Sequence, residues 1–87
     1  MLQMSQEQLL IMHREFKKLV DKKQETLDTH YKNAEVLMNN LGDDTPHTKR
    51  LLVATMTQID WLEDEIRSIE KDIKRIEVRL NRMKGGN

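Results

Sequence analysis

The clearest pattern in the chain is a seven-residue repeat of apolar residues in its second half. With Leu52 at position a, the a series runs to Leu80 and the d series runs from Thr55 to Met83. Every a and d residue in this stretch is apolar except Thr55. A strict repeat of this kind keeps one stripe of a helix against a neighbouring helix, so it predicts coiled-coil packing of the second half.

The first half carries a related pattern that is less regular. Apolar residues recur at three-four spacing between Leu9 and Leu41, which is typical of an amphipathic helix. Ser5 and Gln8 have the spacing of a capping box, in which each side chain binds the backbone amide of the other residue. The first helix is therefore predicted to start at Ser5.

Two polar residues, Lys23 and His30, occupy d positions of this first helix. A polar residue on a seam can fix the register of two helices at some cost in stability. The alternative for Lys23, which we favour, is that its methylenes cover the stripe while its ammonium group points outward. His13 and His30 are expected to line or edge the helical interior, where protonation could tune stability.

Gly42 and Pro46 mark a break between the two helices. Glycine suits the left-handed residue that closes a helix, and proline after Thr45 suits the first position of the next one. The fold class is therefore all-α, an antiparallel two-helix hairpin. The predicted organisation is a disordered N-terminus (1–4), a first helix (5–41), a turn (42–45), a second helix (46–84) and a frayed tail (85–87), with 5–84 as a single domain.

The charges support the antiparallel alignment. Two helices of similar length joined by a short break favour antiparallel packing. The charged residues of segment 14–23 are mostly basic, and those of the segment expected to face it, 64–73, are mostly acidic. Each exposed ion pair contributes roughly a few tenths of a kcal/mol, but together such pairs specify orientation.

A single hairpin buries one thin seam, so a second copy is expected. The hydrophobic fraction is only 37%, and small domains without a disulfide or metal commonly associate. Isoleucine at both a and d favours three or four strands over two. We predict a homodimer that forms a four-helix bundle, with a higher oligomer as the alternative. The predicted oligomer seam comprises Leu9, Phe16, Val20, Leu27, Ala34, Leu41, Leu52, Ile59, Leu62, Ile66, Ile69, Ile73, Ile76 and Leu80.

Trp61 lies at position c, away from the seam. A tryptophan there can be a hot spot for a protein partner, or it can pack against the second hairpin or simply be exposed. Leu10, Ile11 and Leu19 widen the apolar face of the first helix and join Trp61 as candidate partner-binding residues. The competing use of this apolar surface is self-association.

The end of the second helix is basic. Lys74, Arg75, Arg79 and Arg82 are candidate anion-binding residues, for RNA or for a small anionic ligand. The competing interpretation is that they complement the negative end of the helix dipole on a solvated face. The chain has 15 basic and 15 acidic residues, and this neutrality disfavours nucleic acid as the main partner.

Catalytic chemistry has little support in the sequence. There is no cysteine, no glycine-rich phosphate loop, and no histidine pair at metal-ligand spacing. We therefore expect no enzyme activity, no cofactor and no metal. The apolar runs fall far short of the roughly 20 residues of a membrane span, so a cytoplasmic protein without membrane contact is expected.

These features predict a small oligomeric helical-hairpin interaction protein. Its partners would be a second copy of itself and another protein, on which it would act as an adaptor, scaffold or inhibitor. The alternative function is an oligomeric binder of RNA or a small anionic ligand through the basic residues. Small helical chains of this kind are common among phage and plasmid products.

Overall fold

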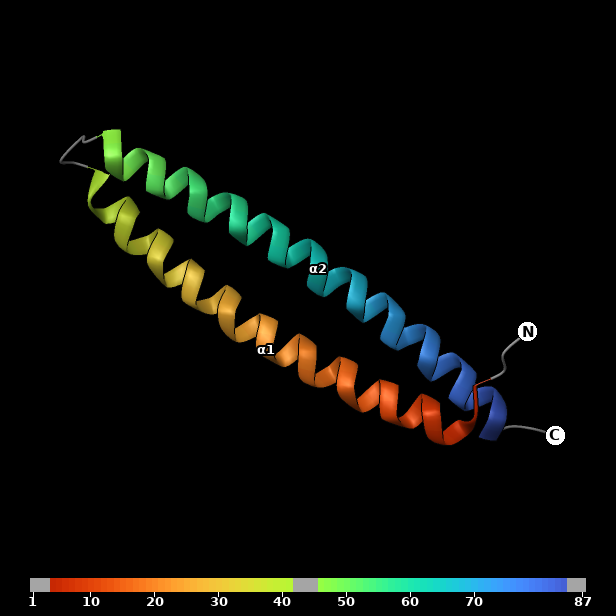
Figure 1. The fold of residues 1–87 in the computed structure, drawn as a ribbon. Coiled ribbons are helices and arrows are strands. Elements are labelled where there is room, and N and C mark those ends of the chain that lie inside the picture. Colours follow the sequence, from red (N-terminus) through yellow and green to blue (C-terminus); the bar gives the residue numbers. More distant parts are fainter. Residues whose placement is uncertain (1–3, 42–45, 85–87) are drawn as a thin grey trace.

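The computed structural model describes residues 4–41 and 46–84. These residues form two helices, α1 (Gln6–Asn39, 34 residues) and α2 (Pro46–Lys84, 39 residues). The two helices run antiparallel along their whole lengths (Figure 1). The molecule is a rod of 65 × 21 × 16 Å. The all-α hairpin predicted from the heptad pattern is thus confirmed.

The capping box at the start of α1 is present. The Gln8 amide donates to the Ser5 hydroxyl oxygen at 3.1 Å, and the Ser5 amide donates to the Gln8 side-chain oxygen at 2.9 Å. Ser5 is therefore the N-cap, and the helix proper begins one residue later, at Gln6. The predicted N-terminal segment includes Met4. This residue is among those that the structure describes, and it lies outside the helix.

The end of α1 corrects the predicted boundary. The helix stops at Asn39, two residues before the expected end at Leu41. Asn40 donates its amide to the carbonyls of both Val36 and Leu37 at 3.2 Å, which tightens the last turn. The apolar stripe continues to Leu41, which is half-buried, but consecutive asparagines favour a helix end over a helix interior.

The second helix begins at Pro46 and ends at Lys84, as predicted. The predicted turn at 42–45, with the proposed roles of Gly42 and Thr45, lies outside the described residues. So do the predicted tail at 85–87 and the first three residues of the predicted disordered N-terminus.

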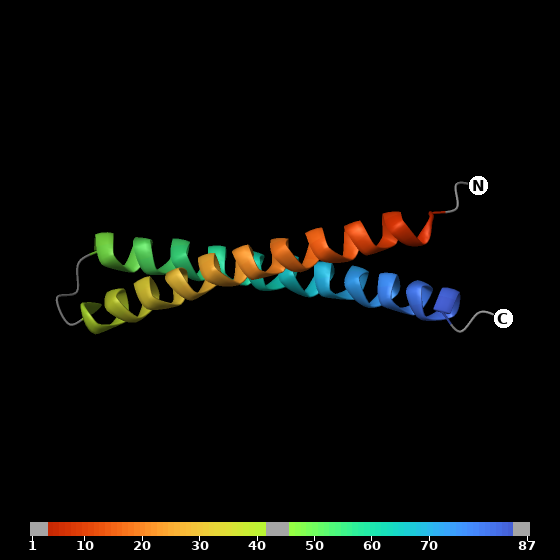
Figure 2. The ribbon, with the colours of Figure 1, turned by 90° about the horizontal axis from the view of Figure 1, so that it is seen from below.

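The core is a single layer of apolar side chains between the helices. Leu9 is the only described side chain that is almost completely enclosed, with 1% of its surface exposed. The central cluster joins two residues of α1 to three of α2: Leu27, Ala34, Ile59, Leu62 and Ile66. The residues predicted for the seam are all buried or half-buried within the hairpin. In Figure 2 the helices cross at a shallow angle near their middles, as in coiled-coil packing.

Among the described residues, polar contacts between the helices support their alignment at three levels along the rod. His13 Nε2 lies 3.1 Å from Glu77 Oε2, and the Tyr31 hydroxyl donates to Glu63 at 2.6 Å. Between these two levels, the Lys23 ammonium meets Glu65 at 2.5 Å. This last pair joins the basic segment 14–23 to the acidic segment 64–73, as the charge pattern predicted.

Candidate interaction surfaces

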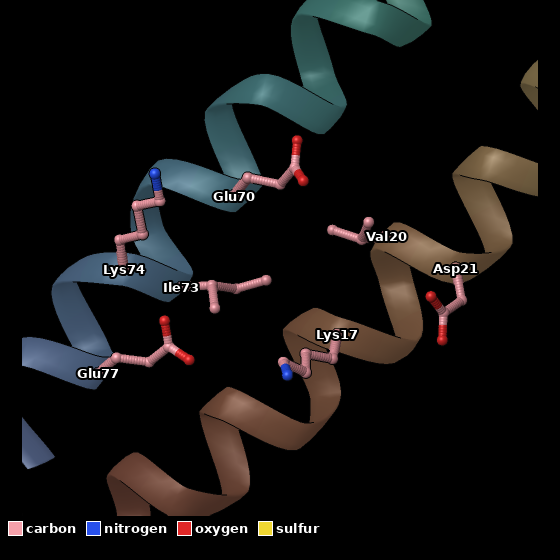
Figure 3. A pocket seen from close by; sticks show the side chains of 7 residues that line it. All are labelled: Lys17, Val20, Asp21, Glu70, Ile73, Lys74 and Glu77. Atoms are coloured by element: carbon pink, nitrogen blue, oxygen red, sulfur yellow. The ribbon is translucent and has the colours of Figure 1, made fainter.

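The hairpin has two flanks, one on each side of the seam, and they differ in chemistry. The first flank carries a hollow of about 480 Å³ lined by both helices (Figure 3). Val20 and Ile73 form its apolar part. Its remaining lining is charged and mixes both signs: Lys17, Asp21, Glu70, Lys74 and Glu77. Among the described residues, this lining offers ammonium and carboxylate groups and no hydroxyl, thiol or imidazole.

The other flank carries a groove whose lining is more apolar than that of this hollow, and we call it the apolar groove. It holds about 270 Å³ and lies between the start of α1 and the end of α2. Its described charged lining residues all lie on the α2 side, where Arg75 pairs with Asp72 at 4.0 Å. An apolar floor beside a few charged groups is typical of a surface that accepts a large hydrophobic side chain. Its lining is Met4, Leu9, Met12, Phe16, Asp72, Arg75, Ile76 and Arg79.

The four candidate anion-binding residues come together. Lys74, Arg75, Arg79 and Arg82 line one hollow of about 320 Å³ with Val78. All of these described lining residues belong to α2, so α1 does not line this hollow. Arg75 and Arg79 also line the apolar groove, which makes the two hollows neighbours on the same part of α2.

The structure does not bring the candidate partner-binding residues into one patch. Trp61 projects from the first half of α2 and is 62% exposed. Leu10, Ile11 and Leu19 are also exposed, but they belong to the first half of α1, towards the end of the rod where both termini lie (Figure 1). Trp61 and the three aliphatic candidates therefore lie on different helices of the rod.

Tyr31 makes a contact that the sequence analysis missed. Its hydrogen bond to Glu63 raises the pKa of the tyrosine hydroxyl above its ordinary value of 10.0, with smaller contributions from desolvation and from nearby carboxylates. The repeat contained a signal for this pair, because both residues occupy e positions of their helices. In antiparallel coiled coils, flanking positions of like kind face each other across the seam.

His13 lies at the edge of the seam, as expected, and is half-buried beside Glu77. Within residues 4–41 and 46–84, no three metal-binding side chains of the His, Cys, Asp and Glu types gather in one place. Over the same residues, neither helix contains a stretch long and apolar enough to cross a membrane.

Comparison of the chain with protein-family models, curated proteins and solved structures found no match.

Proposed function

We propose that this protein is a small oligomeric interaction protein. It associates with itself as a homodimer that forms a four-helix bundle, and it acts on another protein by binding it, as an adaptor, scaffold or inhibitor. One observation carries this proposal. The core between the two helices is very thin, and many large apolar side chains remain exposed outside it. The proposal assigns the chain no reaction of its own.

The thin core gives a physical reason to associate. Ordering a chain costs on the order of 1.5 kcal/mol per residue, and a single apolar layer between two helices offsets little beyond that cost. In the described part of the chain, the seam leaves Leu41, Leu52 and Leu80 only half-buried. A second hairpin would cover such residues and bury apolar area in proportion.

Self-association is tested by measuring mass in solution. Light scattering on the purified chain at micromolar concentration should give twice the chain mass of 10.4 kDa. The signal should fall towards the monomer on dilution, because the dimer is held by mass action. A fully helical monomer at this concentration would refute the dimer.

Binding to a foreign protein needs a separate test at an exposed surface. Leu10 and Ile11 lie on α1 away from the apolar groove, and both are exposed. Replacing each by serine should leave helicity and dimer mass unchanged but weaken the binding of a partner purified from the native source by about tenfold or more. Val53→Ser is the matched control, because Val53 is similarly exposed but lies on α2.

A second function is favoured by one specific observation, the gathering of the four basic residues around Val78. In this alternative the oligomer binds RNA or a small anionic ligand there. A fluorescent oligoribonucleotide and inorganic polyphosphate are suitable probes. Binding that falls steeply with salt and is lost in Lys74→Ala with Arg82→Ala would support it, because phosphate contacts release counterions. Absence of binding at low salt would reject it.

A further inference from the structure

One face of α2 lies directly beside the seam. Moving by alternate steps of three and four residues from Leu51 leads through Trp61, Glu65 and Ser68 to Arg82. This set, which we call the flank stripe, lies about a quarter of a turn around the helix from the seam. In a four-helix bundle each helix faces two neighbours, and the second neighbour of α2 would lie against this stripe.

The two halves of the flank stripe are complementary in charge and shape. The first half presents the exposed indole of Trp61 and the carboxylate of Glu65. The second half presents Arg75 and Arg79 beside the apolar groove. A two-fold axis that places two α2 helices antiparallel would set each first half on the other copy's second half, because the same patch serves both subunits in such an interface.

We propose that Trp61 of one copy docks in the apolar groove of a second copy, and that the same contact is repeated by the two-fold axis. The inference rests on the proposed self-association and names its contact surface. The side chain that occupies the apolar groove therefore comes from a second copy of this protein. Trp61 has the chemistry for this groove, because its indole is both a large apolar body and the best aromatic face for a cation.

The groove supplies the matching groups. Met12, Phe16 and Ile76 line it with apolar surface, and Arg75 and Arg79 line its α2 side. Its volume is about 270 Å³. This is enough for one large side chain but not for a folded segment of a partner. A guanidinium over an indole contributes more when water is excluded, as it would be between two copies.

One alignment satisfies the charges along the whole contact. When Trp61 stands opposite Arg79 of the second copy, Glu65 stands opposite Arg75 and Ser68 stands opposite Asp72. Glu65 already meets Lys23 of its own chain, and Asp72 already meets Arg75 of its own chain. The contact would therefore extend two existing ion pairs into networks rather than bury an isolated charge.

The flank of the hairpin that does not carry the apolar groove is the poorer surface for a second copy. It carries the hollow of Figure 3, in which Lys17, Glu70 and Glu77 are among the lining residues. Packing an apolar surface there would remove several charged side chains from water, which is costly for each charge that does not gain a partner. The apolar groove has fewer charged and more apolar residues in its lining.

The test uses two full-length variants, Trp61→Arg and Arg79→Glu, each at an exposed position of α2. Each variant alone should stay helical but raise the dimer dissociation constant at least about 30-fold, in the range of a hot-spot residue. Mixing the two variants should restore a dimer. In the mixed dimer the introduced arginine of one chain would face the introduced glutamate of the other, while the second contact would keep the native Trp61 and Arg79. Mixing that restores nothing would overturn the proposed pairing.

Met56→Arg is the matched control on the other flank of α2, where Met56 is 54% exposed. We expect its dimer to be unchanged. If Met56→Arg dissociates the dimer and Trp61→Arg does not, the copies meet through the other flank; the inference then fails while the proposed self-association stands. If the wild-type chain is a monomer at all concentrations tested, both fail.

Discussion

Replacing Ile66 by alanine tests whether the predicted seam holds the hairpin together. Ile66 is 7% exposed and belongs to the central cluster with Leu27 and Leu62. The change removes three carbons, and at about 0.8 kcal/mol for each buried carbon group the lost transfer free energy is about 2.4 kcal/mol. A cavity adds to this cost, although a single-layer core can collapse around part of the gap. We therefore expect a loss of about 2.5–3.5 kcal/mol.

The assay is urea denaturation followed by far-ultraviolet circular dichroism at one fixed protein concentration. The concentration must be held constant, because the stability of an associating protein depends on it. Val53→Ala is the control, since Val53 is 63% exposed on the same helix. Both changes replace a β-branched residue by alanine and raise helix propensity by similar small amounts. The control should change stability by no more than about 0.5 kcal/mol.

If Ile66→Ala and Val53→Ala shift the midpoint equally, the seam does not discriminate between a and b positions of α2. The heptad assignment would then be wrong, whatever the overall helicity. A loss confined to Ile66→Ala would place most of the stability in the seam, as the thin core requires.

Two further predictions concern the contacts between the helices. The single tyrosine, Tyr31, should titrate by ultraviolet absorbance above its ordinary pKa, and Glu63→Gln should return the midpoint towards 10.0; an unchanged midpoint would contradict the hydrogen bond. Because folding raises this pKa, the stabilising contribution is complete below the pKa of the unfolded tyrosine and is lost as the pH rises through the folded value. Replacing both members of the pair, Lys23→Leu together with Glu65→Leu, should raise the melting temperature by an amount equivalent to about 1 kcal/mol, since two apolar residues commonly stabilise as much as a half-buried ion pair or more; a lower melting temperature would show that the ion pair is worth more.

The fold could be predicted because one strong periodicity governs most of it. The repeat through Ile59, Ile66 and Ile73 leaves α2 one way to bury its apolar stripe, and all three residues are buried. The capping box at Ser5 and the proline at position 46 are local signals with few competing interpretations, and they located the start of each helix to within one residue.

The end of α1 was harder because two signals disagree there. The apolar pattern favours a helix up to Leu41, while Asn39 and Asn40 favour a helix end. In the structure α1 ends at Asn39, so the preference of the asparagines for a helix end prevails. Periodicity reports which residues face the neighbouring helix, and a half-buried Leu41 can do so just beyond the last helical turn.

The candidate surfaces were predicted less well, because they depend on both helices at once. The sequence grouped Trp61 with Leu10 and Leu19 as apolar residues outside the seam, but a list of exposed residues does not say which of them are neighbours. The apolar groove arises only when the start of α1 lies beside the end of α2. The basic cluster was simpler, because Arg75, Arg79 and their neighbours follow one helix face and need no second element.

The two helices contribute unequally to the seam, and this asymmetry supports association. On α2 the a and d positions are apolar almost throughout, while α1 places His13, Lys23 and His30 on its side of the seam. The apolar stripe of α2 is therefore wider than the surface that α1 offers it, and Ile69 is left only half-buried. In a monomer this excess apolar surface stays in contact with water, so it contributes no free energy of burial. A second copy that covers the flank of α2 would convert the excess into an interface, and the polar residues of α1 would then keep the hairpin in register while α2 makes the contact.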